Sequence, residues 1–204
     1  MARTLTPIGK LSRREGVELH PKAAKIMTRR PYGPGQHGQG RRSKPSDYAL
    51  QLREKQKVKL VYGILERQFR RYVHEAERMA GVSGENLLQL LERRLDNAVY
   101  RLGLSTSRQG ARQLVTHAHV TLNGKKVDVP SILVKPGDVI AVKPSSQSKP
   151  YFASIKDTLN ANTVSVSWLK FDAKKMSATV TGLPLREEID TEIHEQLIIE
   201  YYSR

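Results

Sequence analysis

Residues 93–130 read RRLDNAVYRLGLSTSRQGARQLVTHAHVTLNGKKVDVP, and this segment predicts a pair of helices followed by a β-hairpin. Apolar residues at helical spacing indicate the first helix. Gly103 is expected to end it, because glycine readily adopts the left-handed conformation found at helix C-termini. The apolar stripe starts upstream of the segment and comprises Leu87, Leu88, Leu91, Leu95, Ala98, Val99 and Leu102.

The second helix is predicted to begin at Thr106, because Thr106 and Gln109 have the spacing of a capping box. Its apolar face consists of Ala111, Leu114, Val115 and Ala118. Arg108 and Arg112 lie one turn apart on the opposite face, where like charges repel unless an anion compensates them. This face therefore favours an anionic partner, and a solvated basic face is the alternative.

A β-hairpin is predicted to follow. Apolar residues alternate about Asn123-Gly124, the dipeptide that favours a type I′ turn. The alternating residues are Val120, Leu122, Val127 and Val129. Lys125 and Lys126 come directly after the turn and add positive charge near the arginines. The segment is therefore suited to binding phosphate groups by charge and shape.

The composition also indicates a polyanionic partner. The 204 residues include 35 Lys and Arg against 20 Asp and Glu, and the net charge of +15 is typical of proteins that bind nucleic acid. Residues 1–60 alone hold 15 Lys and Arg against 4 Asp and Glu. Apolar runs are short and no secretory signal is visible, so we expect a cytoplasmic protein without membrane contact. The chain has no cysteine, which excludes disulfides and cysteine-bound zinc.

Residues 1–45 form a basic arm that we expect to be loop-rich. Five prolines interrupt it, and it has too few apolar residues for a core of its own. Its arginine pairs are Arg13-Arg14, Arg29-Arg30 and Arg41-Arg42. Arginine-rich segments of this kind commonly become ordered on RNA.

The arm contains GPGQHG at residues 33–38, which matches the dinucleotide-binding pattern GxGxxG. That pattern requires a strand before the glycines and a helix after them, and neither is predicted here. The glycines instead permit close backbone approach to another surface, on which Tyr32 and His37 stack and Gln36 forms hydrogen bonds. A flexible linker is the alternative.

Residues 46–92 are predicted to form short helices. Ser46 is a suitable N-cap, Gly63 is expected to interrupt the first helix, and a second apolar stripe follows it. We expect Phe69 and Tyr72 to lie in the core of this region rather than to stack on bases.

Residues 130–182 are predicted to add strands to the hairpin. The expected elements are a type II turn at 135–138, a strand at 139–142, a polar loop at 144–150, and strands at 164–168 and 178–180. Trp168 is expected to pack in the core. Residues 182–204 are acidic and should dock on protein, either on the basic first region or on a neighbour. Whether 197–202 is helix or strand stays open.

No catalytic motif is present. The sequence has no P-loop, HExxH or GxSxG, and its acidic residues are sparse before residue 183. His117 and His119 would supply two metal ligands, but a zinc site needs three or four. We therefore expect no enzymatic activity, no metal or cofactor, and no small-molecule substrate.

Residues 93–142 resemble the RNA-binding module called the S-four or αL domain, through RRLDNAVYRLGL, TSRQGARQLV, NGKKV and the KPGD turn. Three further motifs, YGPGQHGQGRR, EKQKVKLVYGILERQFRRY and IHEQLIIEYYSR, are similar to the bacterial family of small-subunit ribosomal protein number four. The resemblance extends over essentially the whole chain. Many relatives hold a four-cysteine zinc site in the arm, and this chain departs from them in having none.

The resemblance implies an α+β fold. A basic, loop-rich arm (1–45) would precede a helical domain (46–91, completed by 183–204) and an αL RNA-binding domain (92–182) in which helices pack on a small, mainly antiparallel sheet. It implies a structural constituent of the small ribosomal subunit that binds 16S-type rRNA directly and nucleates assembly of the subunit body. Contact with ribosomal protein number five, tied to translational accuracy, and a place near the point where mRNA enters are implied as well. An organellar ribosome and repression of its own operon stay open.

We therefore expect an RNA-binding surface in two parts, dominated by phosphate contacts that weaken with salt. The first part comprises Arg3, Arg13, Arg14, Tyr32, Gln36, His37, Arg41, Arg42, Arg53, Lys57 and Arg70. The second part comprises Arg93, Arg94, Arg108, Arg112, Gln113, His117, Lys125 and Lys126.

Two other classes of protein are alternatives. An RNA-modifying enzyme would carry the same αL module, but no Asp in the flanks has a recognisable catalytic setting. A DNA-binding regulator would use the helix pair as a helix-turn-helix. An assay of uridine isomerisation and competition by duplex DNA distinguish these classes from an rRNA-binding protein.

Overall fold

The computed structural model describes residues 6–40, 44–156, 166–173, 175–189 and 193–203. The predicted RNA contacts Arg3, Arg41 and Arg42 lie outside these residues, as does part of the predicted strand 164–168. The chain divides into two compact units, residues 1–87 with 192–204 and residues 88–191. Across the described residues, no helix is long and apolar enough to cross a membrane.

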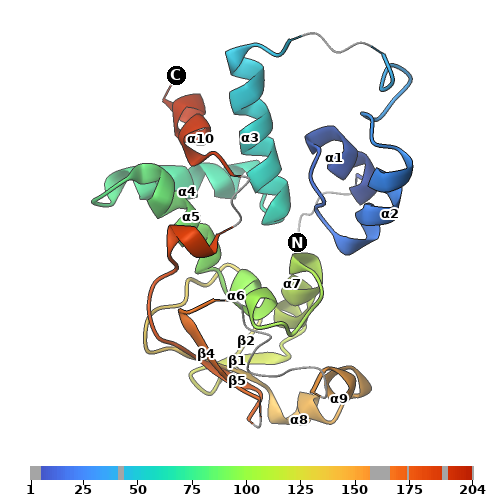
Figure 1. The fold of residues 1–204 in the computed structure, drawn as a ribbon. Coiled ribbons are helices and arrows are strands. Elements are labelled where there is room, and N and C mark those ends of the chain that lie inside the picture. Colours follow the sequence, from blue (N-terminus) through green and yellow to red (C-terminus); the bar gives the residue numbers. More distant parts are fainter. Residues whose placement is uncertain (1–5, 41–43, 157–165, 174, 190–192, 204) are drawn as a thin grey trace. The chain divides into compact units, whose positions relative to one another are not determined.

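The first unit is helical (Figure 1). Its helices are α1 (Ile8–Glu15), α2 (Pro21–Arg29), α3 (Asp47–Val61), α4 (Glu66–Arg78) and α10 (Glu195–Tyr202), and α5 (Ser83–Glu92) crosses into the second unit. The Ser46 hydroxyl accepts a hydrogen bond from the Ala49 N–H and caps α3, as predicted. Phe69 and Tyr72 are buried, which confirms their predicted place in the core.

Helix α10 packs against α3, and the open question about residues 197–202 is thereby answered in favour of a helix. Ile198 is fully buried in α10. The side-chain amide of Gln51 in α3 donates a hydrogen bond of 2.9 Å to the Glu200 carboxylate in α10. The acidic end of the chain thus docks on the basic helical region.

The arm differs from the loop-rich segment that the sequence predicts, because residues 8–29 form two helices. Leu11 and Ala23 are buried between α1 and α2. Gly9 permits close packing, since a Cβ atom there would lie 2.8 Å from Cδ1 of Ile26. His20 caps α2 by accepting a hydrogen bond from the Lys22 N–H. Because so few apolar residues make the contact between α1 and α2, the sequence shows little apolar periodicity here, and the prediction missed both helices.

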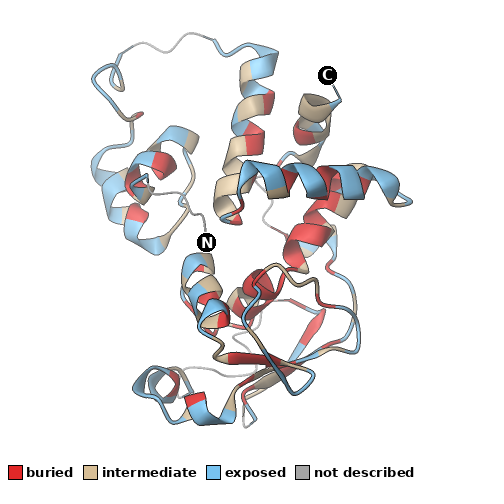
Figure 2. Cartoon of the chain, turned by 180° about the vertical axis from the view of Figure 1, so that it is seen from behind, coloured by how far each residue is buried: buried red, intermediate tan, exposed pale blue. Residues whose placement is uncertain are grey.

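The second unit combines helices with an antiparallel sheet, which confirms the α+β class. Its helices are α6 (Leu95–Arg101), α7 (Arg108–Thr116), α8 (Pro144–Gln147) and α9 (Pro150–Lys156). Its strands are β1 (Val120–Leu122), β2 (Lys125–Val127), β3 (Val139–Val142), β4 (Leu169–Asp172) and β5 (Ser177–Val180). Within the residues described, they form one sheet in the order β2-β1-β3-β5-β4. Figure 2 shows buried residues where α6, α7 and the sheet meet.

Both predicted turns are confirmed. Asn123 and Gly124 have φ values of 51° and 77°, as a type I′ turn requires. Gly137 has a φ of 93°, and the Asp138 N–H donates to the Lys135 carbonyl at 3.0 Å. The two turns are joined, because the Asn123 side-chain amide donates to the Asp138 carboxylate at 2.8 Å.

Three predictions about this unit were wrong in detail. Residues 144–147 form helix α8 and residue 150 begins helix α9, so most of the predicted polar loop is helical. Of the strand predicted at 164–168, the described residues 166–168 are not in a strand and β4 begins at Leu169, although Trp168 is buried as expected. Ser107, not Thr106, caps α7, because the Ser107 hydroxyl accepts a hydrogen bond from the Gly110 N–H at 3.2 Å.

A polar cluster joins α10 to α3 and α4. The Glu66 carboxylate accepts hydrogen bonds from Lys55 (3.0 Å), Lys59 (2.9 Å) and the Tyr202 hydroxyl (2.7 Å). Burial raises the pKa of Glu66, but the hydrogen bonds from Tyr202, Lys59 and Lys55 outweigh burial and lower that pKa to about 2. The Lys55 ammonium also lies 4.5 Å from the centroid of the Tyr201 ring.

We predict that Glu66→Gln removes a pH-dependent part of the stability of this unit. The folded-state pKa of about 2 lies below the ordinary value of 4.5, so the ionised carboxylate stabilises the fold above pH 4.5 and loses this effect as the pH falls toward 2. Because 46% of the side chain is exposed, screening limits the contribution to about 1 kcal/mol. Amides of α10 should exchange faster in the variant than in the wild type at pH 7, and this difference should shrink below pH 4.5.

Glu75→Gln is the matched control, because Glu75 is an exposed carboxylate on the same helix. This control should leave the exchange of the α10 amides unchanged at every pH. A difference between wild type and Glu66→Gln that does not vary with pH would contradict the prediction.

Candidate RNA-binding surface

The break between α5 and α6 fixes the geometry of the basic helix pair. Where the sequence predicts one continuous apolar stripe, Arg94 adopts an extended conformation (φ −64°, ψ 138°) and forms a β-bridge with Leu133. Arg93 is held beside it, because its side chain donates to the Val134 carbonyl at 3.0 Å. Helix α6 therefore starts in a new direction with Asp96 in its first turn.

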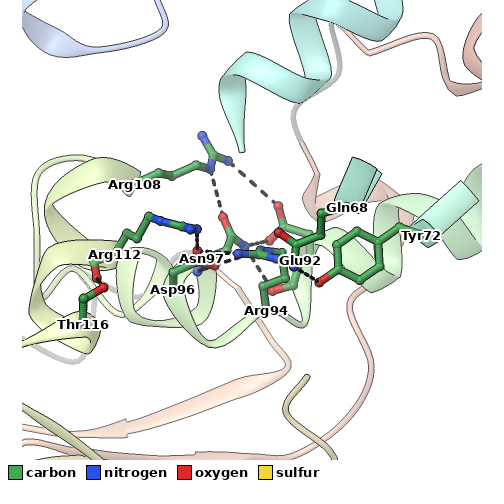
Figure 3. A network of polar contacts seen from close by, with 9 residues as sticks. All are labelled: Gln68, Tyr72, Glu92, Arg94, Asp96, Asn97, Arg108, Arg112 and Thr116. Atoms are coloured by element: carbon green, nitrogen blue, oxygen red, sulfur yellow. Dashed lines mark hydrogen bonds and ion pairs between the residues drawn. The ribbon is translucent and has the colours of Figure 1, made fainter. Parts of the chain in front are cut away.

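Asp96 is the centre of one half of a polar network (Figure 3). Arg94 donates to it from Nε (3.0 Å) and from Nη2 (2.7 Å), and Arg112 donates from Nη1 on α7 (2.9 Å). Arg94 is 0% exposed. The structure thus places Arg94 inside the fold, where its guanidinium anchors Asp96, and not on the surface that the sequence predicts for it.

Glu92 is the centre of the other half (Figure 3). Its carboxylate accepts two hydrogen bonds of 2.9 Å from Arg101 and one of 2.8 Å from the Asn97 amide. Arg108 Nη2 lies 3.9 Å from Oε1 of Glu92, and Arg108 Nε donates to Oδ1 of Asn97 at 2.9 Å. The guanidinium of Arg108 also lies 4.7 Å from the centroid of the Tyr100 ring.

The exposure of the arginine side chains follows from these contacts. Arg101, Arg108 and Arg112 are 10%, 17% and 26% exposed. Arg108 and Arg112 therefore reach the surface with only part of each guanidinium. The sequence does signal this pairing, since Glu92 and Asp96 are acidic residues within a basic segment, but the prediction did not use them.

Other predicted residues of the second unit are exposed. Gln113 and His117 lie on or just after α7, and Lys125 and Lys126 lie on β2, the edge strand of the hairpin. The chain runs directly from α7 into this hairpin. The unit thus presents a partly exposed arginine pair together with exposed lysines and hydrogen-bonding groups.

The structure adds two lysines that the sequence did not single out. Burial lowers the pKa of His119, and the positive charges of Lys149 and Lys143, which lie near it, lower that pKa further. His119 Nδ1 lies 3.0 Å from the Ser146 hydroxyl. Because residues 144–150 were predicted to be a loop, nothing in the sequence placed Lys143 and Lys149 beside the histidines. No cluster of three or more potential metal ligands occurs in the described part of the chain.

In the arm, Arg13 closes the loop that contains GPGQHG. Its guanidinium donates to the carbonyls of Arg30 (3.1 Å), Tyr32 (2.9 Å) and Gly33 (2.9 Å) and stacks 4.8 Å from the centroid of the Tyr32 ring. Gly38 lies against this loop so closely that a Cβ atom would come within 1.9 Å of the Gly33 carbonyl oxygen. The loop is therefore a folded turn held by Arg13, not a flexible linker.

The remaining predicted residues of the first unit differ in how accessible they are. Arg14, Gln36, His37 and Arg70 are exposed, and Tyr32 is half-buried. Arg53 forms an ion pair of 2.9 Å with Glu15, and Lys57 one of 2.9 Å with Glu54. Burial raises the pKa of Glu15, while Arg53, the nearest cation, opposes this rise. Arg53 thus contributes to packing α1 against α3.

Comparisons with known proteins identify the class. A family model described as ribosomal protein S4/S9 N-terminal domain matches residues 3–92, and one described as S4 domain matches residues 93–140. These matches define a ribosomal protein with an S4 domain, which is not an enzyme.

The similar curated proteins narrow the class to one family. Those of Pelotomaculum thermopropionicum, Heliobacterium modesticaldum and Chloroflexus aurantiacus are 53%, 54% and 52% identical to this chain over 100% of each sequence. Each is named small ribosomal subunit protein uS4. The chain belongs to the uS4 family.

We predict that Arg13→Lys loosens the folded turn in the arm. Lysine keeps the charge but cannot donate to three carbonyls from a planar fork, and the lost hydrogen bonds should destabilise the turn by about 2 kcal/mol. The Gly38 and Gly40 amides, which close the turn through the Gly35 and His37 carbonyls, should exchange at least about tenfold faster.

Arg14→Lys is the control, because Arg14 is exposed on the same helix and the substitution is chemically the same. In this variant the Gly38 and Gly40 amides should exchange as fast as in the wild type. Equal exchange in the Arg13→Lys and Arg14→Lys variants would show that Arg13 does not hold the turn.

Proposed function

We propose that this chain is a structural constituent of the small ribosomal subunit that binds small-subunit rRNA directly. The observation that carries the proposal is the surface made by α7 and the hairpin. Lys125 and Lys126 are exposed there, Gln113 and His117 add hydrogen-bonding groups, and Arg112 is partly accessible. Phosphates attract such cations, and side chains held by a packed unit suit a folded RNA.

The arm supplies a second surface in this proposal. Gln36 and His37 are exposed in the turn that Arg13 closes, Arg14 is exposed on α1, and Tyr32 is partly accessible. Aromatic and amide side chains of this kind stack on unpaired bases and bond to their edges. The proposed division is an arm (1–45), a helical domain (46–91 with 183–204) and an αL RNA-binding domain (92–182).

The proposal extends to protein neighbours. We propose contact with ribosomal protein number five, an effect on translational accuracy, a role in nucleating subunit assembly, and a place near the point where mRNA enters, in the cytoplasm. Exposed apolar side chains support a protein contact near the acidic end of the chain. Leu183 and Leu185 are 44% and 57% exposed, and apolar side chains beside acidic residues suit a protein better than RNA.

We predict that Lys125→Ala with Lys126→Ala weakens binding to small-subunit rRNA. Each lost phosphate contact should reduce the slope of log K against log salt by about 1, so the double variant should lose about 2 in slope and roughly tenfold in affinity. Filter binding at several salt concentrations measures both quantities. Lys170→Ala, at an exposed position on β4, is the control.

The wild-type chain should prefer small-subunit rRNA to an unrelated structured RNA of equal length and to duplex DNA. Equal affinity for all three would overturn the proposed function, and preference for duplex DNA would favour a DNA-binding regulator. If the double lysine variant binds as the wild type does, the hairpin is not part of the surface.

We predict that Leu183→Asp with Leu185→Asp weakens the association with ribosomal protein number five by about tenfold. A charged group at the centre of a protein contact loses its water when the contact forms, and this desolvation costs free energy. Affinity for rRNA alone should stay within about twofold of the wild type. Analytical ultracentrifugation of the two purified proteins provides the measurement. Undiminished association would place the contact with protein five elsewhere.

A further inference from the structure

Two carboxylates lie inside the most basic part of the second unit, and the function proposed above does not use them. Glu92 and Asp96 are 1% and 4% exposed. In the described contacts they pair with the guanidinium groups of Arg94, Arg101, Arg108 and Arg112. One guanidinium is sufficient to balance the charge of one carboxylate, and here each carboxylate contacts two.

The first effect of these carboxylates is on charge. Four guanidinium groups face two carboxylates in the described part of the network, so half of the positive charge is compensated inside the protein. Sequence-independent binding to RNA depends on uncompensated cations, because each phosphate contact releases counterions. The internal anions therefore reduce the attraction of this face for any RNA.

The second effect is on geometry. Arg108 is held on three sides, by Oδ1 of Asn97 at 2.9 Å, by Glu92 at 3.9 Å and by the Tyr100 ring at 4.7 Å. Arg112 is held by Asp96 at 2.9 Å. A long side chain normally loses rotamer freedom when it binds. Here both arginines have already been fixed on α7, so the direction of their accessible N–H groups is set before RNA arrives.

We propose that Glu92 and Asp96 are positioning residues that determine specificity for the folded rRNA. They hold Arg108 and Arg112 in one orientation, and they weaken binding to RNA of any other shape by compensating the charge. This inference rests on the proposed function, since it assumes that the α7 face meets rRNA.

The principal test is Arg108→Lys in the full chain. Lysine keeps the positive charge but lacks the planar fork that contacts Asn97 and stacks on Tyr100. Affinity for small-subunit rRNA should fall about tenfold, while affinity for an unrelated structured RNA of equal length and its salt slope should stay within experimental error. Because the Arg108 side chain is only 17% exposed, a thermal melt must first show that the variant is folded. Arg71→Lys, on the exposed face of α4, is the matched control.

The second test is Glu92→Gln, which removes a carboxylate at nearly constant size. The unrelated RNA should bind several-fold more tightly, with a salt slope steeper by about 1, and the preference for small-subunit rRNA should fall about tenfold. Glu187→Gln changes the net charge by the same amount at an exposed site of the same unit, and it should leave the preference for small-subunit rRNA unchanged. A thermal melt of each variant shows whether it is folded.

The outcomes separate the two proposals. If the wild type shows no preference for small-subunit rRNA, the proposed function fails. If the wild type shows the preference but Arg108→Lys retains it, the inference about positioning is overturned. A loss in equal proportion for both RNAs, in Arg108→Lys or in folded Glu92→Gln, would show a purely structural role and would overturn the inference as well.

Discussion

The buried ion pair between Arg94 and Asp96 is the contact on which the second unit depends. Both hydrogen bonds run between neighbouring parts of the same short segment, so the pair fixes the break between α5 and α6. The backbone of Arg94 is tied in turn to Leu133. Removing one member of a buried pair leaves an uncompensated charge and costs about 3–5 kcal/mol. The orientation of α6, and of the arginines that pair with its polar face, follows from this contact.

The same pair changes how the basic surface should be understood. A strongly positive sequence suggests a surface that binds by charge alone, yet Arg112 shares the carboxylate that Arg94 holds. In the arm, the Arg13 guanidinium donates hydrogen bonds to three backbone carbonyls. Several arginines of this protein therefore shape the proposed RNA-binding surfaces from within, and the lysines of the hairpin remain as accessible charge. Such an arrangement favours recognition of a particular RNA shape.

Local signals in the sequence were sufficient to predict those elements whose conformation depends on a few neighbouring residues. Asn123-Gly124 gave the hairpin turn, Gly137 the second turn and Ser46 the start of α3. The arm helices, α8 and α9 were missed because each depends on a small tertiary contact rather than on a long apolar stripe. Of the predicted RNA contacts, the hairpin lysines and Gln113 are exposed, but the sequence could not separate buried Arg94 from exposed Arg14. That distinction depends on which carboxylate each arginine meets in three dimensions.

The packing of α10 on α3 has a consequence for how the chain folds during synthesis. Helix α10 (Glu195–Tyr202) leaves the ribosome after every residue of the second unit, whereas its partner α3 (Asp47–Val61) leaves long before. Domains generally fold as they emerge, so residues 88–191 can complete their core before α10 is available to pack against Gln51 and Lys55 of α3. In a nascent chain the second unit would thus reach its final fold first, and the first unit would complete its packing only when α10 binds to α3.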